Sequence, residues 1–91
     1  MRDLLESIDT LLGRLERESP RQESLEWYLV NNLRWYREKM QNAKTKQDVE
    51  NATRVLSRFS SESMDWASDL FRECTRIEEK GVQLAKSWTD R

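Results

Sequence analysis

The residues that could carry out chemistry in this chain are few, and their spacing does not favour catalysis. The sequence has no His and a single Cys, Cys74. It therefore lacks a Ser-His-Asp triad, a Cys-His pair and an imidazole ligand for a metal. The adjacent carboxylates Glu78 and Glu79 would point in different directions on a helix, so they do not form a catalytic or metal-binding pair. We therefore predict no catalytic residue, no metal site and no cofactor.

Two of these side chains have simple structural interpretations. Cys74 lies within an apolar stripe at helical spacing, which predicts a buried and unreactive thiol. Glu78 lies toward the apolar side of the same segment, whereas Glu79 lies on the solvent side. We predict that Glu78 forms an ion pair with Arg14 on the facing segment, because a carboxylate near a core is usually paired.

The aromatic residues are the strongest indication of a binding function. Trp66 and Trp88 lie on or beside an apolar stripe, and we predict that both are structural. A second set of apolar residues lies on the flank or the polar side of the segment around residue 30. Because Trp is enriched in binding hot spots, this set predicts a partner-binding surface. Its members are Trp27, Tyr28, Val30 and Trp35. The alternative for Trp27 is that it covers an internal seam of the bundle, and the alternative for Trp35 is that it belongs to the core.

The charge distribution suggests a different partner. The net charge is -1, but residues 31–46 carry five cations against one acid, Glu38. With Trp35 and Tyr36 nearby, this segment could contact nucleic acid through phosphates and stacking. The acidic pI of about 5.5 favours a solvated helix face instead. The residues of this alternative nucleic-acid-binding site are Arg34, Arg37, Lys39, Lys44, Lys46, Arg54 and Arg58.

These side chains must be positioned by helices, because the composition favours an all-α fold. Two Gly and one Pro in 91 residues leave little room for the tight turns of a β protein. Apolar residues recur at three- and four-residue spacings from Leu4 to Leu15, which predicts a helix over about residues 2–18.

A second helix is predicted over about residues 20–43, beginning at the only Pro of the chain. Ser19 is a favourable N-cap, Pro20 suits the first helical position, and Gln22 would complete a capping box. The first two helices therefore meet at a kink at Ser19-Pro20.

The remaining segment predicts one long helix over about residues 46–89. Thr45 and Asp48 form a plausible capping pair at its start. The apolar stripe keeps the same phase on both sides of Ser60–Ser63, and a break would normally shift that phase. A continuous helix here would be about 66 Å long. The alternative is a break near Ser61.

The lengths of these helices predict an extended antiparallel hairpin, in which a first arm kinked at Ser19-Pro20 packs against one long C-terminal helix. Contacting residues would have numbers that add up to about 89. The apolar arcs are wider than one neighbour can cover, so two hairpins are predicted to pair into a four-helix bundle, or the hairpin binds a different helical partner. The alternative is a compact three- or four-helix bundle within one chain.

The sequence therefore predicts one helical domain over residues 1–91 that acts by binding rather than catalysis. We expect a protein–protein interaction module of the adaptor, small chaperone or inhibitor type, which forms a homodimer. No secretory signal is evident and no apolar run approaches the roughly 20 residues of a membrane span, so we expect a cytoplasmic protein without a membrane partner.

Overall fold

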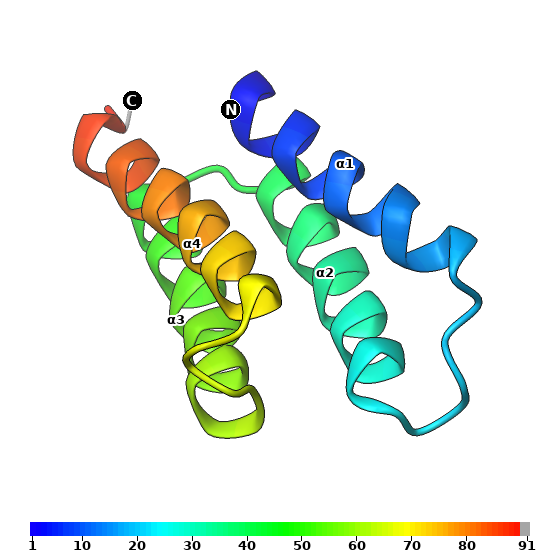
Figure 1. Cartoon of the computed structure of the whole chain (residues 1–91). Coiled ribbons are helices and arrows are strands. Elements are labelled where there is room, and N and C mark those ends of the chain that lie inside the picture. The colour runs from blue at the N-terminus through cyan, green and yellow to red at the C-terminus, as the bar shows by residue number, and fades with distance from the viewer. Residues whose placement is uncertain (90–91) are drawn as a thin grey trace.

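The computed structural model describes residues 1–89, which form four helices in an up-and-down arrangement (Figure 1). The helices are α1 (Arg2–Arg17), α2 (Leu25–Gln41), α3 (Lys46–Ser63) and α4 (Asp69–Ser87). The predicted all-α class is confirmed. The arrangement is the compact bundle that the sequence left as the alternative, and the last two residues of the predicted domain lie outside the described residues.

The prediction of one helix over residues 46–89 is wrong, because the chain turns back at residues 64–68. Met64 has an extended backbone at φ −109° and ψ 152°, and Ser68 caps α4 by accepting a 3.1 Å hydrogen bond from the Phe71 amide. Trp66 Nε1 donates to the Ser61 carbonyl at 2.8 Å, which satisfies a carbonyl in the last turn of α3. The longest dimension of the molecule is 43 Å, shorter than the long hairpin would require.

The start of the second helix also differs from the prediction. The cap of α2 is Ser24, whose side chain accepts a 3.2 Å hydrogen bond from the Trp27 amide, so Ser19 and Pro20 lie in a loop and not at a helix start. Ser19 and Glu23 have φ values of 48° and 67°, the left-handed region that side chains other than Gly rarely adopt. This loop lets α1 fold back beside α2 rather than continue it.

The turn between α2 and α3 follows the prediction. Thr45 and Asp48 form a reciprocal capping box, in which the Asp48 amide donates to Thr45 Oγ1 at 3.1 Å. The Asp48 carboxylate accepts from the amides of Lys44 and Thr45 at 3.0 and 3.2 Å. These hydrogen bonds lower the pKa of Asp48.

The predicted register survives although the predicted hairpin does not. The Tyr36 hydroxyl lies 2.8 Å from Thr53 Oγ1, so α2 and α3 are paired as the sequence indicates. The facing of α1 and α4 is close to the prediction as well, since Arg14 forms an ion pair with Glu73. The structure is therefore the predicted antiparallel hairpin with each of its two arms folded back on itself, one at the α1–α2 loop and the other at the α3–α4 loop.

The core lies along the middle of all four helices. Its fully buried large side chains are Ile8, Leu29, Leu33, Tyr36, Met40, Val49 and Leu56. A polar seam closes the bundle between α1 and α4, where Lys80 Nζ donates to Ser7 Oγ at 2.6 Å and lies 3.2 Å from Asp3. Gly81 is buried where α4 approaches α2 and α3, and a Cβ at this position would lie 2.6 Å from Thr53 Oγ1.

Candidate interaction surface

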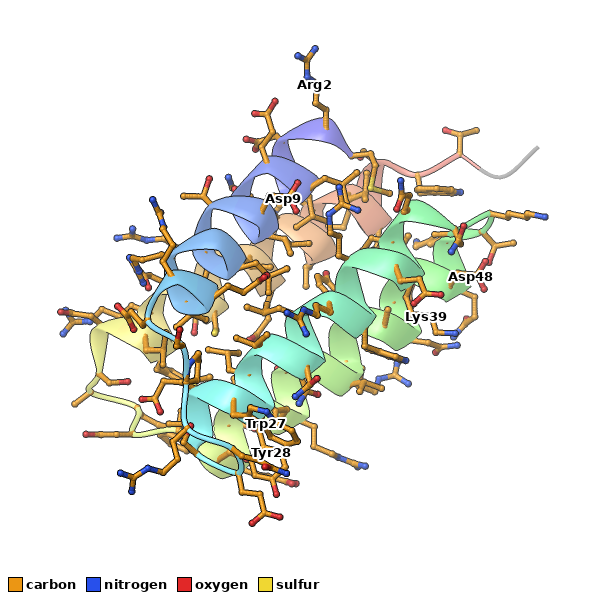
Figure 2. All side chains as sticks on the ribbon, turned by 90° about the vertical axis from the view of Figure 1, so that its right-hand side faces the viewer. Arg2, Asp9, Trp27, Tyr28, Lys39 and Asp48 are labelled. Atoms are coloured by element: carbon orange, nitrogen blue, oxygen red, sulfur yellow. The ribbon has the colours of Figure 1, made fainter. Side chains whose placement is uncertain are left out.

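Two aromatic side chains of α2 remain exposed beside α3. Tyr28 is 44% exposed and Trp35 is 36% exposed, and they lie two helical turns apart on the same side of α2. Lys39 Nζ lies 5.9 Å from the centre of the Trp35 ring, within range of a cation–π contact. Figure 2 shows Tyr28 near the start of α2 and Lys39 near its end.

Val55 of α3 extends this surface across the seam between the two helices. It is 47% exposed and lines the same depression of about 370 Å³ as Trp35, Lys39 and Asp48. We call the surface formed by Tyr28, Trp35, Lys39 and Val55 the α2–α3 face. It presents the apolar side chains of Tyr28, Trp35 and Val55 together with the cation Lys39, and the acid Asp48 lies at its margin.

The other predicted binding residues on α2 are more buried than Tyr28 and Trp35, although the Trp27 ring contacts the Tyr28 ring edge-on, with ring centres 5.0 Å apart. Val30 is only 5% exposed and is part of the core, so its predicted place on the partner-binding surface is wrong. Trp27 is half-buried and lies with Val30, Pro20 and Glu16 around a depression between α2 and the α1–α2 loop. The alternative role of Trp27, covering an internal seam, fits this position.

The cations predicted as an alternative nucleic-acid site do not share one face. Arg34 and Arg37 turn toward α1, where Arg34 pairs with Glu16 at 3.3 Å and Arg37 with Asp9 at 2.6 Å. Asp9 lies on α1 in Figure 2. Lys39 and Lys44 lie at the α2 end near the turn to α3. Three further cations line a groove on the opposite side of α3, next to α4; they are Lys46, Arg54 and Arg58.

The two chemically distinctive side chains of α4 lie in the interior or at its edge. Cys74 is buried as predicted, and its burial raises the pKa of the thiol to about 12. The predicted ion pair between Glu78 and Arg14 is wrong, because Arg14 pairs with Glu73 instead. Glu78 accepts a 2.7 Å hydrogen bond from Ser60 Oγ of α3.

The expectation that Trp66 belongs to the fold interior is wrong as well. Its side chain is 68% exposed and stacks on Phe71 with ring centres 6.2 Å apart. Trp88, by contrast, is half-buried and packs against the core as predicted.

Sequence reasoning missed Val55 as a member of the α2–α3 face, because it lies at the edge of an apolar stripe and has no flanking aromatic residue. The signal that could have identified it is the antiparallel register, which places residue 55 opposite Trp35. Only the turn at residues 42–45 brings the two positions onto one surface.

The described residues contain no group of three or more acidic, Cys or His side chains that could hold a metal ion, and none of the helices they form is long and apolar enough to cross a membrane. Comparison with family models, with curated proteins and with solved structures finds no match to this chain.

Proposed function

We propose that this protein is a non-enzymatic helical protein–protein interaction module that acts by self-association through the α2–α3 face. The observation that carries the proposal is the exposure of Tyr28 and Trp35 on one side of α2, next to exposed Val55 of α3. Large aromatic side chains bury much apolar surface with few rotatable bonds, which is why they dominate binding energies.

A second copy of the chain is the occupant that the charges of this face favour. Lys39 and Asp48 line the same depression and have opposite signs. A two-fold axis through the face would therefore place the Lys39 of one copy near the Asp48 of the other. The aromatic side chains would meet in the centre, where water is excluded.

The reactive groups support a binding role rather than a catalytic one. Cys74, the single thiol, is buried with a pKa raised to about 12, so it is protonated and inaccessible at neutral pH. Its free, unpaired state suits a reducing compartment, and a cytoplasmic location is part of this proposal.

The test is the molecular mass in solution, measured by sedimentation equilibrium over a range of concentrations. We expect a dimer for the unmodified protein. Trp35→Glu would bring a charge into the contact and weaken association at least about tenfold. Helix content, measured by circular dichroism, should stay unchanged, because Trp35 is not in the core.

Trp66→Glu is the matched control, because it makes the same change at an exposed Trp in the α3–α4 loop, outside the α2–α3 face. It should leave the dimer intact. A monomer at every concentration would overturn self-association, and an equal loss with Trp66→Glu would show that the α2–α3 face is not the contact.

A further inference from the structure

The loop between α3 and α4, yellow in Figure 1, contains no residue that requires the chain to turn. Its five residues, 64–68, include no Gly and no Pro, and none of them has a left-handed backbone. The α1–α2 loop differs, because it contains Pro20 and two residues with positive φ, Ser19 and Glu23. Residues 64–68 are therefore compatible with a helix, whereas the α1–α2 loop is not.

The seam between α3 and α4 follows one heptad register that runs through this loop. Positions that alternate by four and three residues form one face of a helix, as in a coiled coil. Such positions continue from α3 through the loop into α4, and those next to the loop are Ser60, Met64, Ala67, Phe71 and Cys74. All but Ala67, where the chain turns, are buried or half-buried. A continuous helix would present these five side chains as one seam to an antiparallel copy of itself.

The hydrogen bonds of the turned loop have helical replacements. Trp66 Nε1 donates to the Ser61 carbonyl at 2.8 Å, and a continuous helix would bring the Asp65 amide to that carbonyl. The Phe71 amide donates to Ser68 Oγ at 3.1 Å, and in a continuous helix it would donate to the carbonyl four residues earlier. Straightening the loop therefore leaves neither the Ser61 carbonyl nor the Phe71 amide without a partner.

A second copy of the chain can supply the contacts that α4 makes in the bundle. Glu78 of α4 accepts from Ser60 Oγ of α3 at 2.7 Å, and Lys80 Nζ of α4 donates to Ser7 Oγ of α1 at 2.6 Å. These partners belong to α1 and α3, so the place vacated by one α4 fits the α4 of another copy. The exchange conserves the contacts inside each bundle, and its cost is limited to the loop conformation and the entropy of association.

From these observations we propose that two copies of this chain exchange α4, and that residues 64–68 then join α3 and α4 into one helix. The monomer keeps the turned loop, and the continuous helix belongs to the exchanged dimer alone. The register of the bundle, in which Ser60 faces Glu78, places Met64 of one copy opposite the helical turn from Phe71 to Cys74 of the other. This dimer is a second mode of self-association and does not rest on the α2–α3 face.

The test is the effect of Ser68→Ala, made in a Trp35→Glu chain so that the α2–α3 face does not contribute. Ser68 caps α4 in the turned loop, whereas Ala favours an uninterrupted helix. Each protein is unfolded in urea, refolded at high concentration and diluted, and its mass is measured by size-exclusion chromatography with light scattering. Dilution dissociates surface contacts, but an exchanged dimer must first release α4. We expect Ser68→Ala to raise the dimer-to-monomer ratio about fivefold or more.

Ser24→Ala in the same Trp35→Glu chain is the matched control. Ser24 caps α2 as Ser68 caps α4, accepting a 3.2 Å hydrogen bond from the Trp27 amide, but the loop before it cannot become helical. This variant should not raise the ratio. A monomer after every refolding of Ser68→Ala would overturn the exchange, and so would equal ratios for the two Ser variants. Neither result bears on the α2–α3 face, because the Trp35→Glu change has already removed it.

Spin labels at Arg54→Cys and Val82→Cys identify the exchange directly. Both positions line one depression between α3 and α4, so the labels are close together in the turned chain. In a continuous helix their separation of 28 residues corresponds to about 42 Å. Cys74 is buried and does not take the label. Labelled Ser68→Ala chains are refolded with an excess of unlabelled chains, so that only distances within one chain are measured. Double electron–electron resonance on the dimer should show the long distance, and a short distance alone would overturn the exchange.

Discussion

The hydroxyl of Tyr36 and Oγ1 of Thr53 lie 2.8 Å apart in the buried centre of the bundle, joining α2 to α3. Burial raises the pKa of Tyr36 to about 12, so the phenol is protonated at neutral pH. Tyr36→Phe leaves the Thr53 hydroxyl without this partner and should lower the free energy of unfolding by about 1–2 kcal/mol. Urea denaturation measures this cost.

The Tyr36–Thr53 bond also predicts non-additivity. Thr53→Val alone leaves the phenol unpaired, whereas Thr53→Val with Tyr36→Phe removes both partners. The double variant should therefore lose less stability than the two single variants together. Strict additivity would mean that the bond contributes nothing to the bundle.

The two glycines should respond to alanine in opposite directions. A Cβ at Gly81 would overlap the Tyr36 hydroxyl and Thr53 Oγ1, so Gly81→Ala should destabilise the protein by about 1–3 kcal/mol. A Cβ at Gly13 meets nothing within 4 Å, so Gly13→Ala should stabilise α1 by up to about 1 kcal/mol. Thermal denaturation of both variants checks the signs; stabilisation by Gly81→Ala would show that α4 packs less closely.

Glu78→Gln should change the pH dependence of stability. Because burial raises the pKa of Glu78, the folded state binds more protons than the unfolded chain between the usual pKa of 4.5 and the folded-state pKa. The contribution of Glu78 to stability therefore falls as the pH rises through that window. Glu78→Gln removes this fall, so the variant should gain stability relative to the unmodified protein as the pH rises through that window.

The pH comparison has an internal control. Glu73 has a pKa lowered by its hydrogen bond from Arg14, so its contribution is lost as the pH falls, in both proteins alike. The difference between unmodified protein and variant therefore isolates Glu78. A difference that does not vary with pH would contradict the assignment. Glu79→Gln should show a smaller difference, because the Glu79 carboxylate is a lesser cause of the raised pKa of Glu78 than burial is.

Truncations along the apolar stripe separate the core from its edge. Leu56 is fully buried, so Leu56→Ala should cost about 2–5 kcal/mol. Leu70 is half-buried in the first turn of α4 and should cost less, although the sequence places both at the centre of one stripe. Arg54→Ala should stay within about 0.5 kcal/mol. Urea denaturation measures both costs. Equal costs would show that Leu70 is as important to the core as Leu56, as the continuous apolar stripe in the sequence predicts.

The helical class, the register and the Thr45–Asp48 cap could be predicted because each depends on local spacing. The break at residues 64–68 could not be predicted from the apolar phase, since α3 and α4 both turn their stripes toward the same core. The local signals were present in Ser68, a good N-cap, and in Asp65, whose side chain accepts a hydrogen bond from the Ala67 amide. Both signals were overlooked, because the apolar stripe keeps the same phase on the two sides of the break.

The candidate surface was predicted only in part for a similar reason. Tyr28 and Trp35 could be identified because they lie on the flank of the α2 stripe, and that flank depends only on α2. Val30 was wrongly placed on the binding surface. It is buried because α1 folds back beside α2, and that contact depends on the loop at residues 18–24. Val55 required knowledge of which helices are neighbours.

The polar seam between α1 and α4 has a consequence for how fast this chain folds. Most other helix contacts join consecutive helices, whereas Arg14 and Glu73 are 59 positions apart and Asp3 and Lys80 are 77 apart. Chains dominated by local contacts fold in microseconds to milliseconds. Closing the α1–α4 seam needs the largest loss of chain entropy, so it follows the transition state. Glu73→Gln, which removes the ion pair with Arg14 from this seam, should therefore accelerate unfolding and leave the folding rate unchanged.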